Sequence, residues 1–309
     1  MKTPGVYYAG AKLMRGRFLF LFMIAMAILV SIPTNSMAGD LIEKVDSWGK
    51  INWTAGYLEA KGFHKTSDRK DDGTIDWERV LAEAREKAFD HLLKTVKAVR
   101  IQGEMTLGEM EEDEAILVKI MDMVNKSAIV NQEYGTDGRV EVTMGFSFFG
   151  GFSQLILPMD IEHVESIQSL GQKKNETESD DSIALPKKNK AESFTGFIID
   201  ARGLSAAPSM TIKILNENGD EIYGSAFVSR EVAVQNGMCL YESDMASSIK
   251  NHRVSGNPMV IKALRTHHFK GSDLVIRNTD ALKIKSSSEH LAFLALCRVV
   301  IVIDPLQDP

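Results

Sequence analysis

The stretch Trp77-Glu-Arg-Val-Leu-Ala-Glu-Ala-Arg-Glu-Lys-Ala-Phe-Asp-His-Leu-Leu-Lys-Thr-Val-Lys-Ala-Val99 decides the fold of the N-terminal half of the chain. Its apolar residues recur at three- and four-residue steps, which is the spacing of one face of an α-helix. They are Trp77, Val80, Leu81, Ala84, Ala88, Leu92, Val96 and Val99. We predict an amphipathic helix over 77–99 with Asp76 as its N-cap, and small side chains at 84 and 88 that let it lie close to a sheet.

Strand patterns surround this helix on both sides. The predicted elements are a half-buried strand over 50–60, a polar loop over 65–74, a second helix over 111–125, and strands over 128–134 and 139–148. Asp137-Gly138 is a hairpin signal between the last two strands. A sheet with two helices on one face follows, which is an α+β domain.

Residues 1–38 differ in composition from the rest of the chain. Four basic residues and no acid precede the 15-residue uncharged run Phe18–Ile32, and Ser36-Met-Ala38 supplies small residues at −3 and −1. This order predicts a secretory signal peptide that is cleaved between Ala38 and Gly39. The alternative is an uncleaved inner-membrane anchor, because Leu13 and Met14 would lengthen the run toward the roughly 20 residues of a bilayer span.

Composition and charge exclude several classes of partner. The chain is 44% hydrophobic and 25% charged, which is ordinary for a globular protein. Its formal net charge of −6 becomes −10 when residues 1–38 are removed, because they hold four basic residues and no acid. An acidic exported protein is a poor candidate for nucleic acid or for anionic lipid headgroups. We expect no lipid anchor, because no cysteine lies near the cleavage site.

The chain is predicted to hold two folded domains, at 39–160 and 194–309, joined by a flexible linker over 161–193. The linker is polar and contains Gln172-Lys-Lys-Asn-Glu-Thr-Glu-Ser-Asp-Asp181, which cannot bury enough surface to fold. The C-terminal domain is predicted to be mixed α+β. Its expected strands are 194–199, 209–215, 221–223, 258–263, 273–276 and 294–303, and its expected helices are 244–250 and 279–287. The last strand is apolar throughout and is predicted to be central.

Three pieces of the N-terminal half carry a family resemblance. They are Trp53-Thr-Ala-Gly-Tyr-Leu-Glu-Ala-Lys-Gly62, Ala82-Glu-Ala-Arg-Glu-Lys-Ala-Phe-Asp-His-Leu-Leu93 and Asp137-Gly-Arg-Val-Glu-Val-Thr-Met144. Over residues 48–158 the chain resembles a small bacterial lipoprotein domain, first described as a twenty-kilodalton membrane-associated antigen. It is similar as well to the N-terminal domain of the flagellar assembly protein T family. The lipidated cysteine of the lipoprotein pattern is absent.

The C-terminal half adds to this resemblance. Thr195-Gly-Phe-Ile-Ile-Asp-Ala-Arg-Gly203 and Gly256-Asn-Pro-Met-Val-Ile-Lys-Ala263 look like an extension found beside that domain in some bacterial envelope proteins. The resemblance implies a non-enzymatic role in the envelope, in the periplasm or at the outer membrane, sometimes near the flagellar base. It implies no catalytic residues.

Candidate chemistry outside the resemblance is sparse. Asp200 and Arg202 follow a predicted strand, where a carboxylate and a guanidinium form either a turn clamp or part of a site. Cys239 and Cys297 would enter an oxidising compartment, where they form either a disulfide or two buried thiols. Histidines 252, 267 and 268 with Asp273 lack the spacing of a metal site, so we expect no metal and no cofactor.

Two functions remain open from the sequence. The first is an exported, non-enzymatic protein that binds another cell-envelope component, either a protein or a peptidoglycan-associated assembly. The alternative is a periplasmic hydrolase that uses Asp200 and Arg202. A concave site with convergent polar groups would favour the enzyme, and an exposed apolar patch or open sheet edge would favour the binding protein.

Overall fold

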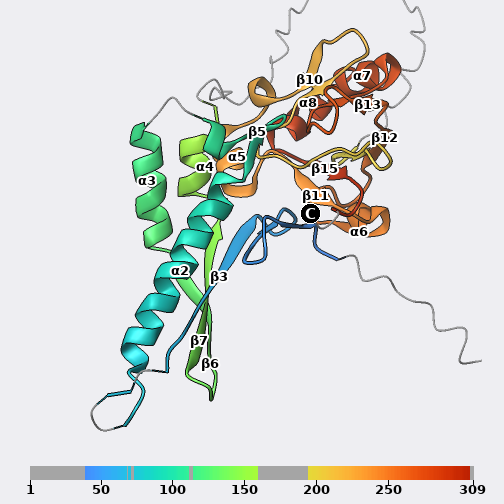
Figure 1. Ribbon diagram of the computed structural model, residues 1–309. Helices are drawn as coiled ribbons and strands as arrows, with labels where there is room; N and C mark the ends of the chain where they lie inside the picture. The colour runs from blue at the N-terminus through green and yellow to red at the C-terminus, as the bar shows by residue number, and fades with distance from the viewer. Residues whose placement is uncertain (1–38, 68, 71–72, 111–113, 159–193, 307–309) are drawn as a thin grey trace, which may run out of the picture. The chain divides into compact units, whose positions relative to one another are not determined.

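Helix α2 (Trp77–Lys97) packs along strands β3 and β7 of a five-stranded sheet, and this contact organises the N-terminal half (Figure 1). Gly62 of β3 (Tyr57–Lys65) allows the close approach. A Cβ at this position would lie 2.1 Å from the backbone nitrogen of Ala88 and 2.4 Å from the carbonyl oxygen of Ala84. The predicted contact of two alanines with a sheet is confirmed. The side chains buried on this face of α2 are Val80, Ala84, Ala88, Leu92, Thr95 and Val96.

This computed structural model describes residues 39–306 except 68, 71–72, 111–113 and 159–193. The predicted signal peptide through Ala38 and the predicted linker over 161–193 therefore lie outside the described residues. The described residues from Asp40 onward belong to one compact unit. No helix in this described part is both long and apolar enough to cross a membrane.

The N-terminal sheet is antiparallel, with the strand order β1-β2-β3-β7-β6. Its other strands are β1 (Ile42–Lys44), β2 (Gly49–Asn52), β6 (Ala128–Tyr134) and β7 (Arg139–Ser147). The hairpin β4 (Arg100–Gln102) and β5 (Met105–Thr106), the 3-10 turn η1 (Leu107–Glu109) and helices α3 (Glu114–Asn125) and α4 (Gly151–Ile156) complete this half. Helix α3 lies beside α2, and the predicted α+β class is confirmed (Figure 1).

One local prediction for this half is wrong, and the predicted N-cap of α2 is confirmed in its position alone. Residues 50–60 form parts of two strands, because the Asn52 Oδ1 accepts a hydrogen bond from the Ala55 N–H at 2.9 Å and Gly56 has a φ of 64°, which together turn the chain. Asp76 occupies the N-cap position of α2, but its side chain makes no capping hydrogen bond. It pairs instead with the Nζ of Lys70 at 3.3 Å.

The C-terminal half contains two four-stranded sheets. The first is parallel, with the order β11-β15-β8-β12, and β15 lies inside it with all four residues buried. Its strands are β8 (Phe197–Asp200), β11 (Leu240–Glu242), β12 (Met259–Lys262) and β15 (Val299–Val302). The second sheet has the order β10-β9-β14-β13, built from β9 (Ile214–Leu215), β10 (Glu221–Tyr223), β13 (Arg265–Thr266) and β14 (Leu274–Val275). The helical segments are η2 (Ser225–Phe227), α5 (Arg230–Asn236), α6 (Met245–Lys250), α7 (Asn278–Lys285) and α8 (Ser288–Ala295).

The prediction of one long strand over 294–303 is wrong. Helix α8 runs to Ala295, and Cys297 has a φ of 53°, a left-handed conformation that breaks the chain direction before β15 begins at Val299. The predicted central position of the apolar strand is confirmed for Val299–Val302. The strand predicted over 209–215 is regular only at Ile214–Leu215.

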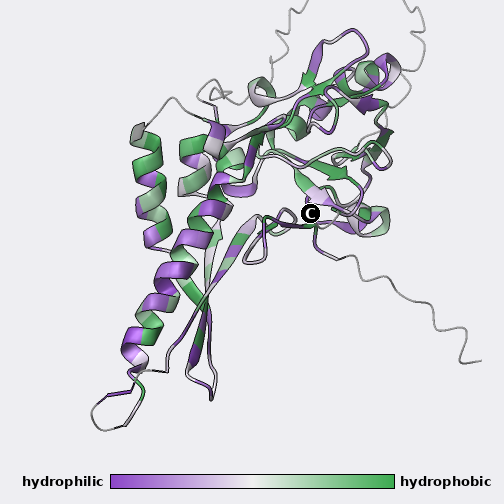
Figure 2. Cartoon of the chain, in the orientation of Figure 1, coloured by the Kyte–Doolittle hydropathy of each residue, from purple (hydrophilic) through white to green (hydrophobic). Residues whose placement is uncertain are grey.

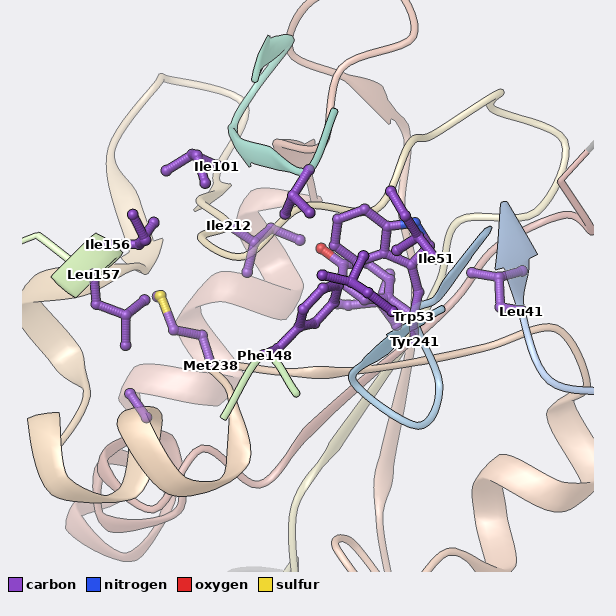
Figure 3. Packing of buried hydrophobic residues seen from close by; sticks show 14 of the residues in the cluster. Leu41, Ile51, Trp53, Ile101, Phe148, Ile156, Leu157, Ile212, Met238 and Tyr241 are labelled. Carbon is purple, nitrogen blue, oxygen red and sulfur yellow. The ribbon is translucent and has the colours of Figure 1, made fainter. Parts of the chain in front are cut away.

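The two halves share one hydrophobic core. Figure 3 shows Trp53 and Phe148 from the N-terminal half packed with Tyr241 from the C-terminal half. The Trp53 ring lies 5.3 Å from that of Phe148 and 6.2 Å from that of Tyr241. Backbone hydrogen bonds join the halves as well, since the Thr211 N–H donates to the Ile101 carbonyl at 2.8 Å.

Candidate binding groove and strand-end site

A groove opens beside α2 where α3 ends. Figure 1 shows α3 alongside the C-terminal part of α2 only, so among the described residues no helix lies beside the N-terminal part on that side. The space has a volume of about 460 Å³ and reaches from α2 to the end of α3 and the start of β6. We call it the α2–β6 groove, and its lining residues are Glu78, Leu81, Ala82, Arg85, Glu86, Phe89, Asn125 and Ile129.

Large apolar side chains are exposed on the elements that border this groove, and one of them, Ile129, lines it. Tyr134 is 53% exposed, Ile129 is 38% exposed, and Trp77, whose ring packs edge-on against Tyr134 at 5.5 Å, is 37% exposed. Val118 and Met121 of α3 are exposed too, and Figure 2 shows α3 as largely hydrophobic along its length. Exposed apolar side chains that gather in one place mark interaction sites more often than scattered ones do.

Strand β6 forms one edge of the N-terminal sheet. Within the described residues it pairs only with β7, and a bulge between Ile129 and Asn131 leaves 131–134 as its regular part. The Gly135 N–H donates to the Arg139 carbonyl at 2.7 Å, so these two residues form a hydrogen-bonded pair. Because such pairs alternate along an antiparallel ladder, the backbone groups of Gln132 and Tyr134 point away from β7. They are available to a further strand.

The predicted residues Asp200 and Arg202 lie together at the carboxyl end of β8. The Arg202 Nε and Nη2 donate to the two carboxylate oxygens of Asp200 at 2.8 and 3.1 Å, and the Arg202 backbone N–H donates at 3.1 Å. The Nζ of Lys262 lies 3.4 Å from the Asp200 Oδ2. The Arg202 hydrogen bond holds the pKa of Asp200 down to about 2. This geometry is that of the turn clamp.

Other carboxylates end the neighbouring strands of the parallel sheet. Asp304 accepts a hydrogen bond from the Gly203 N–H at 2.7 Å. Glu242 is 8% exposed and accepts from the Asn251 Nδ2 at 3.1 Å, and burial raises its pKa. The carboxyl ends of parallel strands are a common place for ligands. Here Asp200, Asp304 and Glu242 each already hold a group of the protein itself.

Cys239 and Cys297 lie on chain segments that Arg253 joins. The Arg253 Nε donates to the Cys297 carbonyl at 2.6 Å and its Nη2 donates to the Gly237 carbonyl at 2.5 Å. Both cysteines are free thiols in the structure. Burial raises the pKa of Cys239 to about 12 and that of Cys297 to about 11, so both resist ionisation. A disulfide between them in an oxidising compartment stays a prediction.

The histidines considered as metal ligands lie on the surface. His267 and His268 are exposed, with ring centroids 4.4 Å apart, and His252 is exposed on another loop. The Asp273 carboxylate accepts from the Lys213 N–H at 2.8 Å. In the part of the chain that the structure describes, no group of three or more potential ligand side chains is placed to hold a metal ion.

The sequence did not reveal the α2–β6 groove. Trp77 and Leu81 fit the helical stripe, which predicts them as core. Trp77 is exposed and Leu81 is only partly buried, because α3 ends at Asn125 and does not cover this part of α2. A usable signal was the mismatch in length between the two predicted helices, because a shorter helix cannot cover a longer neighbour.

The comparisons with known proteins concern the C-terminal half. Residues 196–305 match the family model for the second domain of Treponema pallidum Tp0624. The matched range contains every strand from β8 to β15. No curated protein matches the chain.

Proposed function

We propose that this is an exported, non-enzymatic protein of the bacterial cell envelope that binds another envelope protein through the α2–β6 groove and the outer edge of β6. The observation that carries the proposal is the free β6 edge beside exposed apolar side chains. Export and the envelope setting rest on residues 1–38 and on the family resemblance over 48–158.

The geometry suits an extended segment of a partner protein. Added strands gain affinity from main-chain hydrogen bonds and specificity from pockets for alternate side chains. The outward backbone groups of Gln132 and Tyr134 supply the hydrogen bonds. The groove beside Leu81 and Phe89 receives apolar side chains of the added strand. The net acidic charge of the chain disfavours nucleic acid as the occupant.

A hydrolase at the strand ends is the second candidate, favoured only by the position of the carboxylates at the end of a parallel sheet. General acid–base catalysis works best with a pKa near the working pH. With its pKa near 2 and both oxygens bound by Arg202, Asp200 is a poor base. Burial raises the pKa of Glu242, so Glu242 is a better candidate than Asp200 for a general acid or base.

Site-specific photo-crosslinking in the native envelope tests the binding proposal. A crosslinker at Tyr134 should capture one defined envelope protein, and the same group at Phe269, which is 80% exposed on another loop, should not. The backbone variant Gln132→Pro removes an outward N–H without touching the β7 ladder, so it should abolish the crosslink. Gln132→Val keeps that N–H and serves as the matched control.

Three outcomes would contradict the proposal. Equal capture from Tyr134 and Phe269 would show that the contact is not specific to the groove. Crosslinks only between two copies of this chain would identify a homo-oligomer edge instead. Loss of a measurable hydrolysis in Glu242→Gln or Asp200→Asn, with folding intact, would favour the enzyme.

A further inference from the structure

Glu133 gives the outer edge of β6 a negative charge. The ring of Tyr134 packs against Trp77 of α2, so the Tyr134 side chain lies on the helix side of the sheet. Side chains alternate along a strand, so Glu133 points to the opposite face. Its register partner on β7 is Glu141, which is also an acid. Like charges directly opposite each other are destabilising unless other groups compensate them.

The two carboxylates differ in their partners. The Glu141 Oε1 lies 2.6 Å from the Lys61 Nζ, and its Oε2 lies 2.7 Å from the Arg139 Nη2. Glu133 is exposed, forms no ion pair within the described part of the chain, and accepts a hydrogen bond from the Asn131 Nδ2 at 2.8 Å. Lys61 belongs to β3, on the far side of β7 from β6. The carboxylate without a paired cation therefore lies on the edge strand itself, next to the position of an added strand.

The groove on the other face of β6 has the same sign of charge. The charged residues of its lining are Glu78, Glu86 and Arg85, and all three are exposed. The rest of the lining is apolar apart from Asn125. An added strand thus meets apolar side chains and a net negative charge on the α2 face, and Glu133 on the other face.

The backbone geometry decides which residue of an added strand meets Glu133. Gln132 and Tyr134 have outward backbone groups, so each forms a hydrogen-bonded pair with the added strand. In an antiparallel arrangement, the residue between those two pairs lies directly opposite Glu133 on the same face, with Cβ atoms about 4.5–5.5 Å apart. The two neighbours of that residue point to the α2 face, toward the groove.

The same geometry disfavours a second copy of β6 as the added strand. The regular part, 131–134, offers two outward residues, and the antiparallel register that uses both pairs Gln132 with Tyr134 of the other copy. This register places the two copies of Glu133 opposite each other, where like charges repel. An edge that repels its own copy and attracts a cation discriminates between partners by charge.

We infer that the partner segment is a basic strand, with a lysine or arginine opposite Glu133 and an apolar residue on each side of it that enters the α2–β6 groove. The inference rests on the function proposed above and adds the chemistry of the segment. A cation between two apolar residues suits both faces at once, whereas an acidic or a wholly apolar segment suits at most one.

Two end-blocked synthetic peptides, Ser-Thr-Val-Lys-Val-Thr-Ser and Ser-Thr-Val-Glu-Val-Thr-Ser, test this inference with the full chain. Nitrogen-15 NMR should show saturable shifts of the Gln132 and Tyr134 amides with the lysine peptide. The glutamate peptide should bind at least about fivefold more weakly, because a like-charge pair replaces an attractive one. Salt at about 0.5 M should narrow this difference, because Glu133 is exposed.

Charge reversal at the edge supplies the matched comparison. Glu133→Lys should reverse the preference between the two peptides. Glu104→Lys makes the same charge change at an exposed residue in the turn between β4 and β5, so it should keep the preference. Glu133→Gln, which removes the charge and keeps the size, should abolish the preference, and it replaces Glu133→Lys if that variant fails to fold. In the native envelope, Glu133→Lys should lower capture by the crosslinker at Tyr134 at least about fivefold.

The outcomes separate this inference from the function on which it rests. Equal affinity of the two peptides for the wild-type chain, or capture through Tyr134 that Glu133→Lys leaves unchanged, would overturn the basic strand and leave the binding edge in place. Unchanged amide shifts with both peptides, together with no capture through Tyr134, would overturn both. Capture of a second copy of this chain by the wild-type edge would overturn the charge discrimination.

Discussion

The guanidinium of Arg100 forms a two-pronged ion pair with Glu43, with Nη1–Oε1 at 2.9 Å and Nη2–Oε2 at 2.5 Å. The Nε of Arg100 donates at 2.8 Å to the carbonyl of Pro208, which lies 108 residues further along the chain. The Trp53 Nε1 donates to the same Glu43 carboxylate at 2.8 Å, and Arg100 lies over the Trp53 ring. One side chain therefore connects the first strand of the N-terminal sheet to the C-terminal half.

Arg100→Met should lower the free energy of unfolding by about 2–3 kcal/mol, because the partly buried Glu43 carboxylate would lose its cationic partner. Urea unfolding would measure it. Lys126→Met, which breaks an exposed ion pair with Asp122, is the control and should cost less than about 0.5 kcal/mol. Equal losses for both variants would mean that the Arg100 pair is effectively solvated.

Gly62→Ala should destabilise the protein by about 1–3 kcal/mol, because the added Cβ would meet backbone atoms of Ala84 and Ala88 that cannot rotate away. Gly108→Ala is the matched control. The Cβ added there would lie 3.2 Å from its nearest neighbour, the Lys97 carbonyl oxygen, which is a much milder contact than the one at Gly62. Thermal unfolding of the two variants compares them. A Gly62→Ala protein as stable as the wild type would show that α2 does not lie this close to β3.

Acid should remove the contribution of Asp200. Its folded pKa of about 2 lies below the ordinary value of 3.8, so the stabilisation is fully present above about pH 4 and is lost as the pH falls toward 2. Arg202 is partly exposed, so we expect about 1–2 kcal/mol in all. The stability difference between wild type and Asp200→Asn should therefore shrink from pH 5 to pH 2. A difference that stays constant over this range would contradict the assignment.

The two thiols should react slowly in the reduced, folded protein. With pKa values of about 12 for Cys239 and about 11 for Cys297, few thiolates form at pH 8, and Cys297 is buried. Reaction with a chromogenic disulfide should be at least about 100-fold slower than after unfolding in guanidinium. Rapid reaction in the folded state would contradict this. Protein taken from an oxidising compartment that shows no thiols after unfolding would establish the disulfide.

The elements that follow from the sequence are those with a long, regular period. The helix from Trp77 and the strand from Arg139 lie where their patterns predict, because each buries one continuous face. The strand Ala128–Tyr134 also lies where it was predicted, although most of its residues are exposed. The prediction of one strand up to Ile303 is wrong because buried helices and buried strands have similar sequences in short apolar segments. Only the left-handed backbone at Cys297 separates α8 from β15.

The candidate sites also differ in how far the sequence predicts them. The clamp of Asp200 and Arg202 is local in sequence, so two residues of spacing were enough to suggest it. The α2–β6 groove depends on which apolar residues remain uncovered, and that is a property of the assembled fold. The contact between the His290 ring and the Lys283 carbonyl joins α8 to α7, and periodicity within one helix does not encode it.

The core shared by the two halves has a consequence for protein engineering. Trp53 and Phe148 form a cluster with Tyr241, so either half alone would expose an apolar surface that favours association. Chains 39–158 and 194–309, produced separately and mixed, should recombine into a soluble heterodimer. The two fragments could therefore serve as a split reporter, in which refolding of the fragments reports that they have associated.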